Sequence, residues 1–132
     1  MQHDEFIGRV QDRARLAGRG EAERATRATL QTLAERLPSG LAHNLAGQLP
    51  IEIRDHLESA VASDEPTEAE RLEPREFFER VAERAGTDRA KGSRLAHAVC
   101  AVTSQAVNRP LREKTHDVLP ENLRDLFPVE AG

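Results

Sequence analysis

Arginine is the residue type in this sequence that most suggests a binding chemistry. The chain has 19 basic residues, of which only Lys91 and Lys114 are lysines. A guanidinium group can bind a carboxylate or a phosphate through two parallel hydrogen bonds. Arginines that recur at matching places in two halves of the chain are therefore the candidate interaction residues. They are Arg9, Arg13, Arg54, Arg80, Arg84 and Arg124.

The same arginines could instead form ion pairs within the protein. Glu5 lies four residues before Arg9, and Glu76 lies four residues before Arg80. On a helix this order brings the carboxylate and the guanidinium together favourably. We therefore predict solvated or inter-helix salt bridges for these arginines, with a site for an anion or a partner as the alternative.

His97 and Cys100 come closest to a metal-binding motif. They stand three residues apart on one predicted helix, within reach of a single zinc ion. A structural zinc site needs two further ligands, and the spacing of the other candidates, His43, His56 and His116, does not support a site. We predict no metal and no cofactor, and we interpret the pair as a small core thiol beside a partly exposed imidazole.

Asp55 and Asp125 invite comparison with a pair of catalytic carboxylates. Each directly follows an arginine near a predicted helix end, and acid–base catalysis would require a lined pocket around them. The sequence also lacks a Gly-rich phosphate loop, an HExxH motif and a CxxC motif. We therefore predict no catalytic residue and a protein that is not an enzyme.

The chain repeats itself, and this repeat positions the arginines. Residues 5–14 read EFIGRVQDRA, and residues 76–85 read EFFERVAERA. Later, residues 49–57 read LPIEIRDHL, and residues 119–127 read LPENLRDLF. One gap is enough to align more than fifty positions of the two copies. The sequence therefore consists of a duplicated unit.

The first two helices of each copy are predicted from apolar spacing and capping residues. Apolar residues at positions i, i+4 and i+8 start at Phe6 in the first copy and at Phe77 in the second. A long Ala-rich helix follows, over about residues 21–37 and 89–107. Asp88 is a good N-cap residue for the second of these long helices.

Two shorter helices complete each copy. The third begins at Ser39, which can cap it, and its counterpart begins at Arg109 and Pro110. The fourth starts with Pro50 or Pro120 and ends about seven residues later. Alternation of apolar and polar residues, which would indicate a strand, is absent. The predicted fold class is all-α.

The predicted architecture is two tandem four-helix units packed about a pseudo-twofold axis. A unit of this size buries too little surface to be comfortably stable alone, so the units are expected to share one structural domain. Residues 1–58 form the first helical repeat unit and residues 74–129 the second. Residues 59–73 join them and are predicted to be an acidic, solvated linker.

The doubled pattern of EFxxRVxxRA, an Ala-rich helix and LPxxxRD resembles the bacterial and archaeal family called domain of unknown function 2267. The resemblance covers nearly the whole chain and implies an all-helical tandem fold in a prokaryotic protein. It implies no catalytic residue, cofactor or ligand. The second copy departs from the pattern at residues 107–110, where VNRP stands in place of a Gly-containing turn.

Residues 76–107 show a weaker resemblance, to the opening helix-turn-helix of histone-like nucleoid proteins. In those proteins two such helices form the base of a dimer, and a β-arm contacts DNA. The sequence after residue 107 predicts no β-arm, so this resemblance concerns packing. The formal net charge of −4 also argues against a general nucleic-acid binder, whose surface is usually basic.

The cysteine content and the apolar runs of the sequence indicate the compartment, and the function class follows from the features above. A lone cysteine, Cys100, excludes an internal disulfide and fits a reducing compartment. The acidic first residues are unlike a signal peptide, and no apolar run is long enough to span a membrane. We predict a cytoplasmic, non-enzymatic protein-interaction module that uses a groove between the two units. Its partner is an unidentified protein, and a homodimer is one option.

Two other functions stay open. The first is a small-molecule or anion-binding protein, or an enzyme, with a site at the interface between the repeats. A pocket lined by Arg54, Arg124 and histidines would favour it. The second is a nucleoid- or RNA-associated accessory protein, which a continuous basic strip on the surface would favour.

Overall fold

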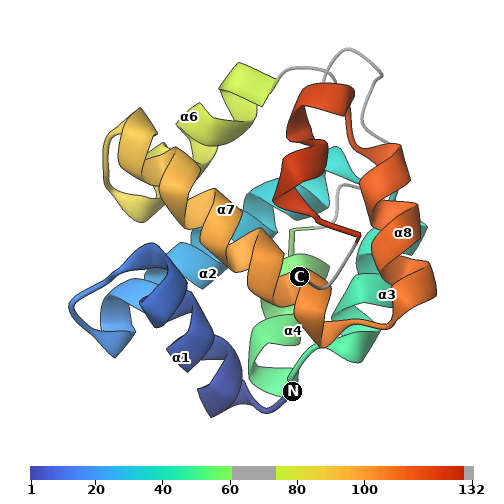
Figure 1. Ribbon diagram of the computed structural model, residues 1–132, viewed down its shortest axis with the longest axis horizontal. Helices are drawn as coiled ribbons and strands as arrows, with labels where there is room; N and C mark the ends of the chain where they lie inside the picture. The colour runs from blue at the N-terminus through green and yellow to red at the C-terminus, as the bar shows by residue number, and fades with distance from the viewer. Residues whose placement is uncertain (61–73, 130–132) are drawn as a thin grey trace.

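The computed structural model describes residues 1–60 and 74–129 (Figure 1). That part of the chain holds seven α-helices and one 3-10 helix and contains no strand, so the fold is all-α. The helices of the first repeat are α1 (His3–Ala14), α2 (Arg19–Arg36), α3 (Ser39–Gln48) and α4 (Ile51–Glu58). Those of the second are α6 (Pro74–Ala85), α7 (Arg89–Ala106), α8 (Arg109–Val118) and the 3-10 helix η1 (Glu121–Leu126).

The helix bounds agree with the sequence prediction at most ends, and capping explains several of them. The carboxylate of Asp88 accepts the backbone N–H of Lys91 at 2.8 Å and begins α7, as predicted. Asn108 accepts the N–H of Leu111 at 3.1 Å and begins α8. A side-chain cap therefore replaces the Gly-containing turn that the second copy lacks. The prediction for Ser39 was wrong, because Pro38 occupies the N-cap position of α3 and Ser39 is its first helical residue.

The fourth helix differs between the two repeats. In the first repeat α4 is an α-helix of eight residues, whereas η1 is a 3-10 helix of six. The residue after η1 is Phe127, which has φ −123° and ψ 75° and precedes Pro128. A residue before proline is disfavoured in the α region, so the chain leaves the helix here. The first repeat has Glu58 at the place of Pro128 and continues its helix.

The two repeats pack reciprocally around the long helices α2 and α7, and Figure 1 shows α7 crossing in front of α2. Helix α1 of the first repeat packs on α7 of the second, and α6 of the second packs on α2 of the first. Helices α2 and α7 also contact each other, as do α3 and α8. This is the contact pattern that a pseudo-twofold arrangement predicts.

One hydrophobic core runs through both repeats. Leu33 in α2 and Val99 in α7 are completely buried and belong to the same cluster as Phe6 and Phe77. Small residues let the helices approach closely. A Cβ atom added to Gly92 in α7 would lie 2.7 Å from the Cβ of Ala82 in α6. Because each repeat covers the other, neither closes its core by itself.

The predictions of an acidic linker and of no membrane-spanning segment have different outcomes. Residues 61–73 of the predicted linker lie outside the described residues. Within the described residues, the helices are all too short or too polar to cross a membrane.

Candidate functional site

Arg54 and Arg124, the arginines of the doubled LPxxxRD motif, lie against the ends of the preceding helices. Arg54 donates from Nε to the carbonyl of Ala46 at 2.9 Å and from Nη2 to that of Leu49 at 3.2 Å. Arg124 donates from Nε to the carbonyl of Leu119 at 3.1 Å. The last carbonyls of a helix lack partners within it, and an arginine can satisfy them. These two arginines therefore stabilise the turns after α3 and α8.

Arg80 and Arg84 of α6 hold a carboxylate that α2 presents across the repeat interface. Arg80 donates to one oxygen of Glu35 at 3.3 Å, and Arg84 donates to the other at 2.6 Å. Arg84 also donates to the hydroxyl of Thr32 at 2.9 Å. Arg80 forms the predicted i,i+4 pair with Glu76 at 2.6 Å. We call Arg80, Arg84 and Glu35 the carboxylate clamp.

The clamp keeps Glu35 ionised. Burial by itself raises the pKa of this carboxyl, but the hydrogen bonds and charges of Arg84 and Arg80 act in the opposite direction and prevail. The pKa of Glu35 therefore lies below its ordinary value of 4.5. Arg36, which is buried, forms a separate ion pair with Glu76 at 3.4 Å.

The corresponding place in the first repeat has the arginines but lacks the carboxylate. Arg9 matches Arg80, pairs with Glu5 at 2.6 Å, and donates to the side-chain oxygen of Gln105 at 3.1 Å. Gln105 in α7 is the repeat equivalent of Glu35 in α2. Arg13 matches Arg84, is exposed, and has no side-chain partner within the described residues. Arg9, Arg13 and Gln105 are called the open clamp below.

Sequence reasoning found the arginines of both clamps but missed Glu35 and Gln105. Their relation is visible in the sequence, because the repeat offset of 70 aligns the two positions. What the sequence did not indicate is that each contacts one or two arginines of the other repeat, Glu35 with Arg80 and Arg84 and Gln105 with Arg9. That contact depends on α1 crossing α7 and α6 crossing α2.

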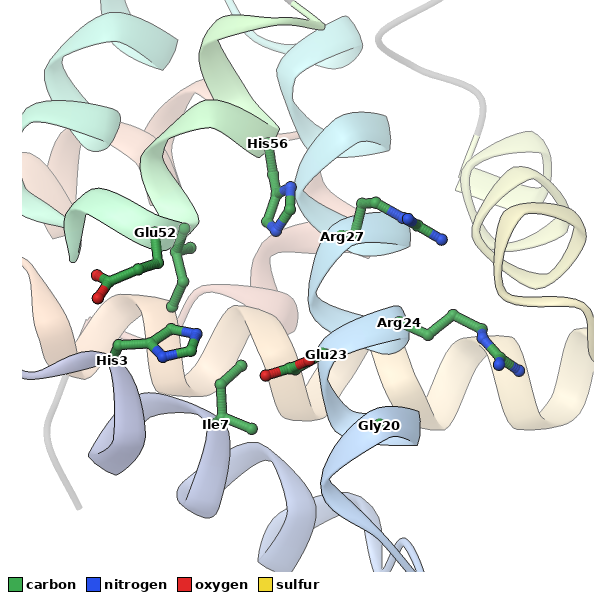
Figure 2. A pocket seen from close by; sticks show the side chains of 9 residues that line it. His3, Ile7, Gly20, Glu23, Arg24, Arg27, Glu52 and His56 are labelled. Carbon is green, nitrogen blue, oxygen red and sulfur yellow. The ribbon is translucent and has the colours of Figure 1, made fainter.

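A second polar feature is a hollow of about 340 Å³ between α1, α2 and α4, which we call the first-repeat hollow. His3, Glu23, Glu52 and His56 supply its polar groups, and Ile7 and Ile53 supply apolar surface. Figure 2 shows the rings of His3 and His56 and the carboxylate of Glu23 pointing into this space. A pocket lined by Arg54, Arg124 and histidines would favour a site between the repeats, but this hollow lies within one repeat and neither arginine lines it.

The charged side chains around the first-repeat hollow differ in whether they point into it or away from it. Arg24 and Arg27 contribute to its wall, but Figure 2 shows their guanidinium groups pointing away from it. Arg19 pairs with Asp4 at 2.5 Å and with Glu23 at 3.4 Å. Burial, followed by the charge of Arg27, lowers the pKa of His56 below its ordinary value of 6.5. This imidazole is therefore neutral at neutral pH.

At the equivalent place the second repeat has a wider hollow of about 850 Å³, and one ring of an aromatic stack forms part of its wall. Phe78 stands at the position of Ile7, and His97 stands at the position of Arg27. Their rings lie parallel within 12°, with centroids 5.7 Å apart. The two repeats have therefore diverged in the lining of this place, which has histidines and carboxylates in the first repeat and Phe78, Ser93 and two arginines in the second.

The two candidate zinc ligands, His97 and Cys100, differ in exposure to solvent. Cys100 is completely buried, and burial raises the pKa of its thiol to about 12. His97 is exposed, with its Nδ1 2.8 Å from the carbonyl oxygen of Ser93. Among the residues that the structure describes, no three His, Cys, Asp or Glu side chains are grouped so as to hold a metal. Asp55 and Asp125 are both exposed.

A groove between the repeats lies where α3 meets α8. It has a volume of about 480 Å³ and is lined mainly by polar side chains, His43, Asn44 and Gln48 on one side and Asn108 and Lys114 on the other. The side chain of Gln48 accepts the backbone N–H of Asn108 at 2.7 Å and ties its two walls together.

Comparison with known proteins gives one family. Residues 3–126 match a family described as "Uncharacterized conserved protein (DUF2267)". A comparison with curated proteins gives no match.

Proposed function

The chain belongs to the DUF2267 family, and we propose that it is a non-enzymatic binding module for an acidic protein partner. The observation that carries this proposal is the difference between its two clamps. In the second repeat an arginine pair grips the carboxylate of Glu35. In the first repeat the matching pair is Arg9, which donates to the amide oxygen of Gln105, and Arg13, which is exposed.

The carboxylate clamp indicates which chemical group the open clamp can bind. Arg80 binds Glu76 and Glu35 at once, so an arginine in this position can hold two carboxylates. Arg9 already holds Glu5 and has only an amide oxygen in the second place. Arg13 is exposed one helical turn further along α1. An Asp or Glu side chain from a partner would complete the arrangement.

A protein carboxylate fits the open clamp better than a nucleic-acid backbone. Nucleic-acid binding usually uses many phosphate contacts and a basic surface, whereas this chain carries a net charge of −4. Each exposed ion pair contributes only about 0.2–1 kcal/mol. The open clamp therefore gives orientation and charge selectivity, and the partner must also bury surface around it.

The test uses the repeat itself as a guide. Gln105→Glu gives the open clamp a carboxylate of its own, as Glu35 does in the carboxylate clamp. This carboxylate competes with the carboxylate of a partner. Cell extract is passed over the wild type, Gln105→Glu and Arg13→Gln, with Arg75→Gln, at an exposed position of α6, as the matched control. A protein retained by the wild type and the control, but lost from the other two variants, supports the proposal.

Two results would contradict it. Equal retention by the wild type and Gln105→Glu would show that the open clamp does not take part. Loss of the captured material after nuclease treatment would show that nucleic acid, and not an acidic protein, is the partner.

The groove between α3 and α8 is a second candidate surface for a protein partner, because both repeats build its walls. Lys114→Glu reverses the charge of one wall and can be included in the same capture experiment.

The single, buried thiol of Cys100 supports a location in the reducing cytoplasm. The occurrence of the repeated pattern in a bacterial and archaeal family supports a prokaryotic source.

A further inference from the structure

The groove between α3 and α8 differs from the open clamp in its place and in its lining. It lies where α3 of the first repeat meets α8 of the second (Figure 1), whereas the open clamp lies where α1 meets α7. Its volume is about 480 Å³. A water molecule occupies roughly 30 Å³ of liquid volume, so the groove has room for a small organic molecule.

Two carboxamides of the groove are held so that their NH2 groups are left over. The side-chain oxygen of Gln48 accepts the backbone N–H of Asn108 at 2.7 Å. The side-chain oxygen of Asn108 in turn accepts the backbone N–H of Leu111 at 3.1 Å. A backbone N–H only donates, so these bonds fix which end of each carboxamide is engaged. The two NH2 groups have no partner among the described residues, and they can only donate.

The charge in the groove is positive. Lys114 is the one Lys, Arg, Asp or Glu residue in its described lining, and it has no ion pair within the described part of the chain. Helix α3 has no acidic residue along its whole length. On α8, Glu113 is paired with Arg109 at 2.8 Å, and Asp117 lies outside the lining. The groove therefore favours an anion, although the chain as a whole carries a net charge of −4.

The helix ends that border the groove are compatible with an anion. The groove meets the start of α8 at Asn108, where the helix dipole is positive. It meets the end of α3 at Gln48, where unpaired carbonyl oxygens would repel an anion. Arg54 donates to two carbonyls of that end, those of Ala46 and Leu49, and brings a positive charge to them.

These donors and this charge fit a carboxylate better than a phosphate. A carboxylate carries one negative charge at neutral pH, which Lys114 balances, whereas a phosphate monoester carries about 1.5 to 2. The two oxygens of a carboxylate can accept hydrogen bonds from the ammonium group and from both NH2 groups. Pro110 and Leu111 also line the groove and supply apolar surface for a short carbon chain.

We propose that the groove between α3 and α8 binds a small monocarboxylate, with the carboxylate at Gln48, Asn108 and Lys114 and the carbon chain against Pro110 and Leu111. This goes beyond the proposed binding of an acidic protein at the open clamp. The two sites share no residue, so each can succeed or fail independently of the other.

The test compares three probes of equal chain length, butyrate, butyramide and butylammonium. Each is titrated at neutral pH and constant ionic strength into the full-length, isotopically labelled protein, and amide chemical shifts are followed by NMR. Butyrate should cause saturable shifts in α3 and α8, and the other two should bind about tenfold more weakly or not at all. Equal binding of butyramide or butylammonium, or shifts that fall mainly outside these helices, would overturn the proposal.

A fourth probe distinguishes a free carboxylate from one that a protein side chain supplies. A blocked tripeptide with a central glutamate presents the same group on a peptide backbone. Its N–H groups need acceptors, and two of the three carboxamide oxygens that line the groove are already engaged. The tripeptide should therefore bind more weakly than butyrate. Tighter binding would make the groove a docking surface for a protein and would contradict the small-molecule assignment.

Two carboxamide variants remove the donors and keep the contacts that hold the groove together. In Gln48→Glu a carboxylate oxygen can still accept the N–H of Asn108, but the NH2 group becomes a second accepting oxygen. Asn108→Asp makes the same change and keeps a good N-cap residue for α8. Each variant should weaken butyrate binding more than about tenfold while the amide spectrum stays dispersed.

Lys114→Gln tests the charge, with Lys91→Gln as the matched control. These are the two lysines of the chain, and Lys91 does not line the groove. Lys114→Gln should weaken butyrate binding about tenfold, and Lys91→Gln should leave it unchanged. Unchanged affinity in Lys114→Gln, or in both carboxamide variants, would place the carboxylate elsewhere and refute the assignment.

Discussion

Glu35 connects the two repeats electrostatically, and replacing it with glutamine tests how strongly. Glu35→Gln makes the second repeat like the first, which has Gln105 at this position. The variant keeps the size of the side chain but removes its charge and replaces one accepting oxygen with an NH2 group that only donates. Arg80 and Arg84 then lose their shared carboxylate, although Arg80 keeps Glu76 and Arg84 keeps Thr32.

The expected cost follows from how exposed the groups are. The side chain of Glu35 is 26% exposed, and those of Arg84 and Arg80 are 30% and 37% exposed. Hydrogen bonds to charged groups contribute about 1.5–3 kcal/mol when buried, and exposed ion pairs contribute about 0.2–1 kcal/mol. Two bonds in this intermediate setting give a loss of about 1–2 kcal/mol in the free energy of unfolding at neutral pH.

The pH dependence gives a second, independent prediction from the same variant. The pKa of Glu35 is lowered in the folded protein, so its contribution to stability is complete above the unfolded value and is lost as the pH falls through the folded value. The difference between the wild type and Glu35→Gln should therefore shrink in acid, below the ordinary carboxyl pKa of 4.5.

Urea unfolding followed by far-UV circular dichroism is the suitable assay, because the chain has no Trp or Tyr for fluorescence. Glu83→Gln is the matched control, since Glu83 is exposed on α6 and makes no ion pair among the described residues. Gln105→Glu should have the opposite effect and stabilise the fold by about 0.2–1 kcal/mol. A loss in Glu35→Gln no larger than in the control, or a difference that persists unchanged in acid, would refute the reasoning.

Four further results are expected from the packing of the two repeats. Gly92→Ala should destabilise the protein by about 1–3 kcal/mol in urea unfolding, because the added Cβ would meet α6 at 2.7 Å; an effect equal to that of Gly40→Ala, whose Cβ has open space, would contradict this. Leu33→Ala should cost about 2–5 kcal/mol, and a loss below about 1 kcal/mol would show that this residue is not in the core. Cys100 should resist thiol reagents until the protein unfolds, since it is buried with a pKa of about 12; stoichiometric labelling of the native protein would argue against that packing. Residues 1–62 expressed alone should unfold or dimerise, because α1 and α2 lose α7 and α6, and a folded monomer in sedimentation would disprove the shared core.

The sequence by itself determined the features that depend on near neighbours along the chain. Apolar spacing predicted the helices and the all-α class, and the repeat predicted corresponding helices in both halves. The spacing of four residues predicted the ion pairs of Glu5 with Arg9 and of Glu76 with Arg80, both of which form at 2.6 Å. These features follow from the geometry of a single helix, in which residues four apart share a face. Residues 59–73 remain a predicted linker.

Only the tertiary structure decided which side chains of one repeat bind the arginines of the other. The partners of Arg80 and Arg84 lie on α2, about fifty residues earlier in the chain, and α2 presents them because α6 packs across it. The first-repeat hollow likewise requires α1, α2 and α4 to meet at one place. Such contacts depend on the crossing of packed helices, which is set by side-chain shape across the whole interface and not by local spacing. For this reason the sequence indicated the arginines, and the packing decided which of them bind a carboxylate of the other repeat.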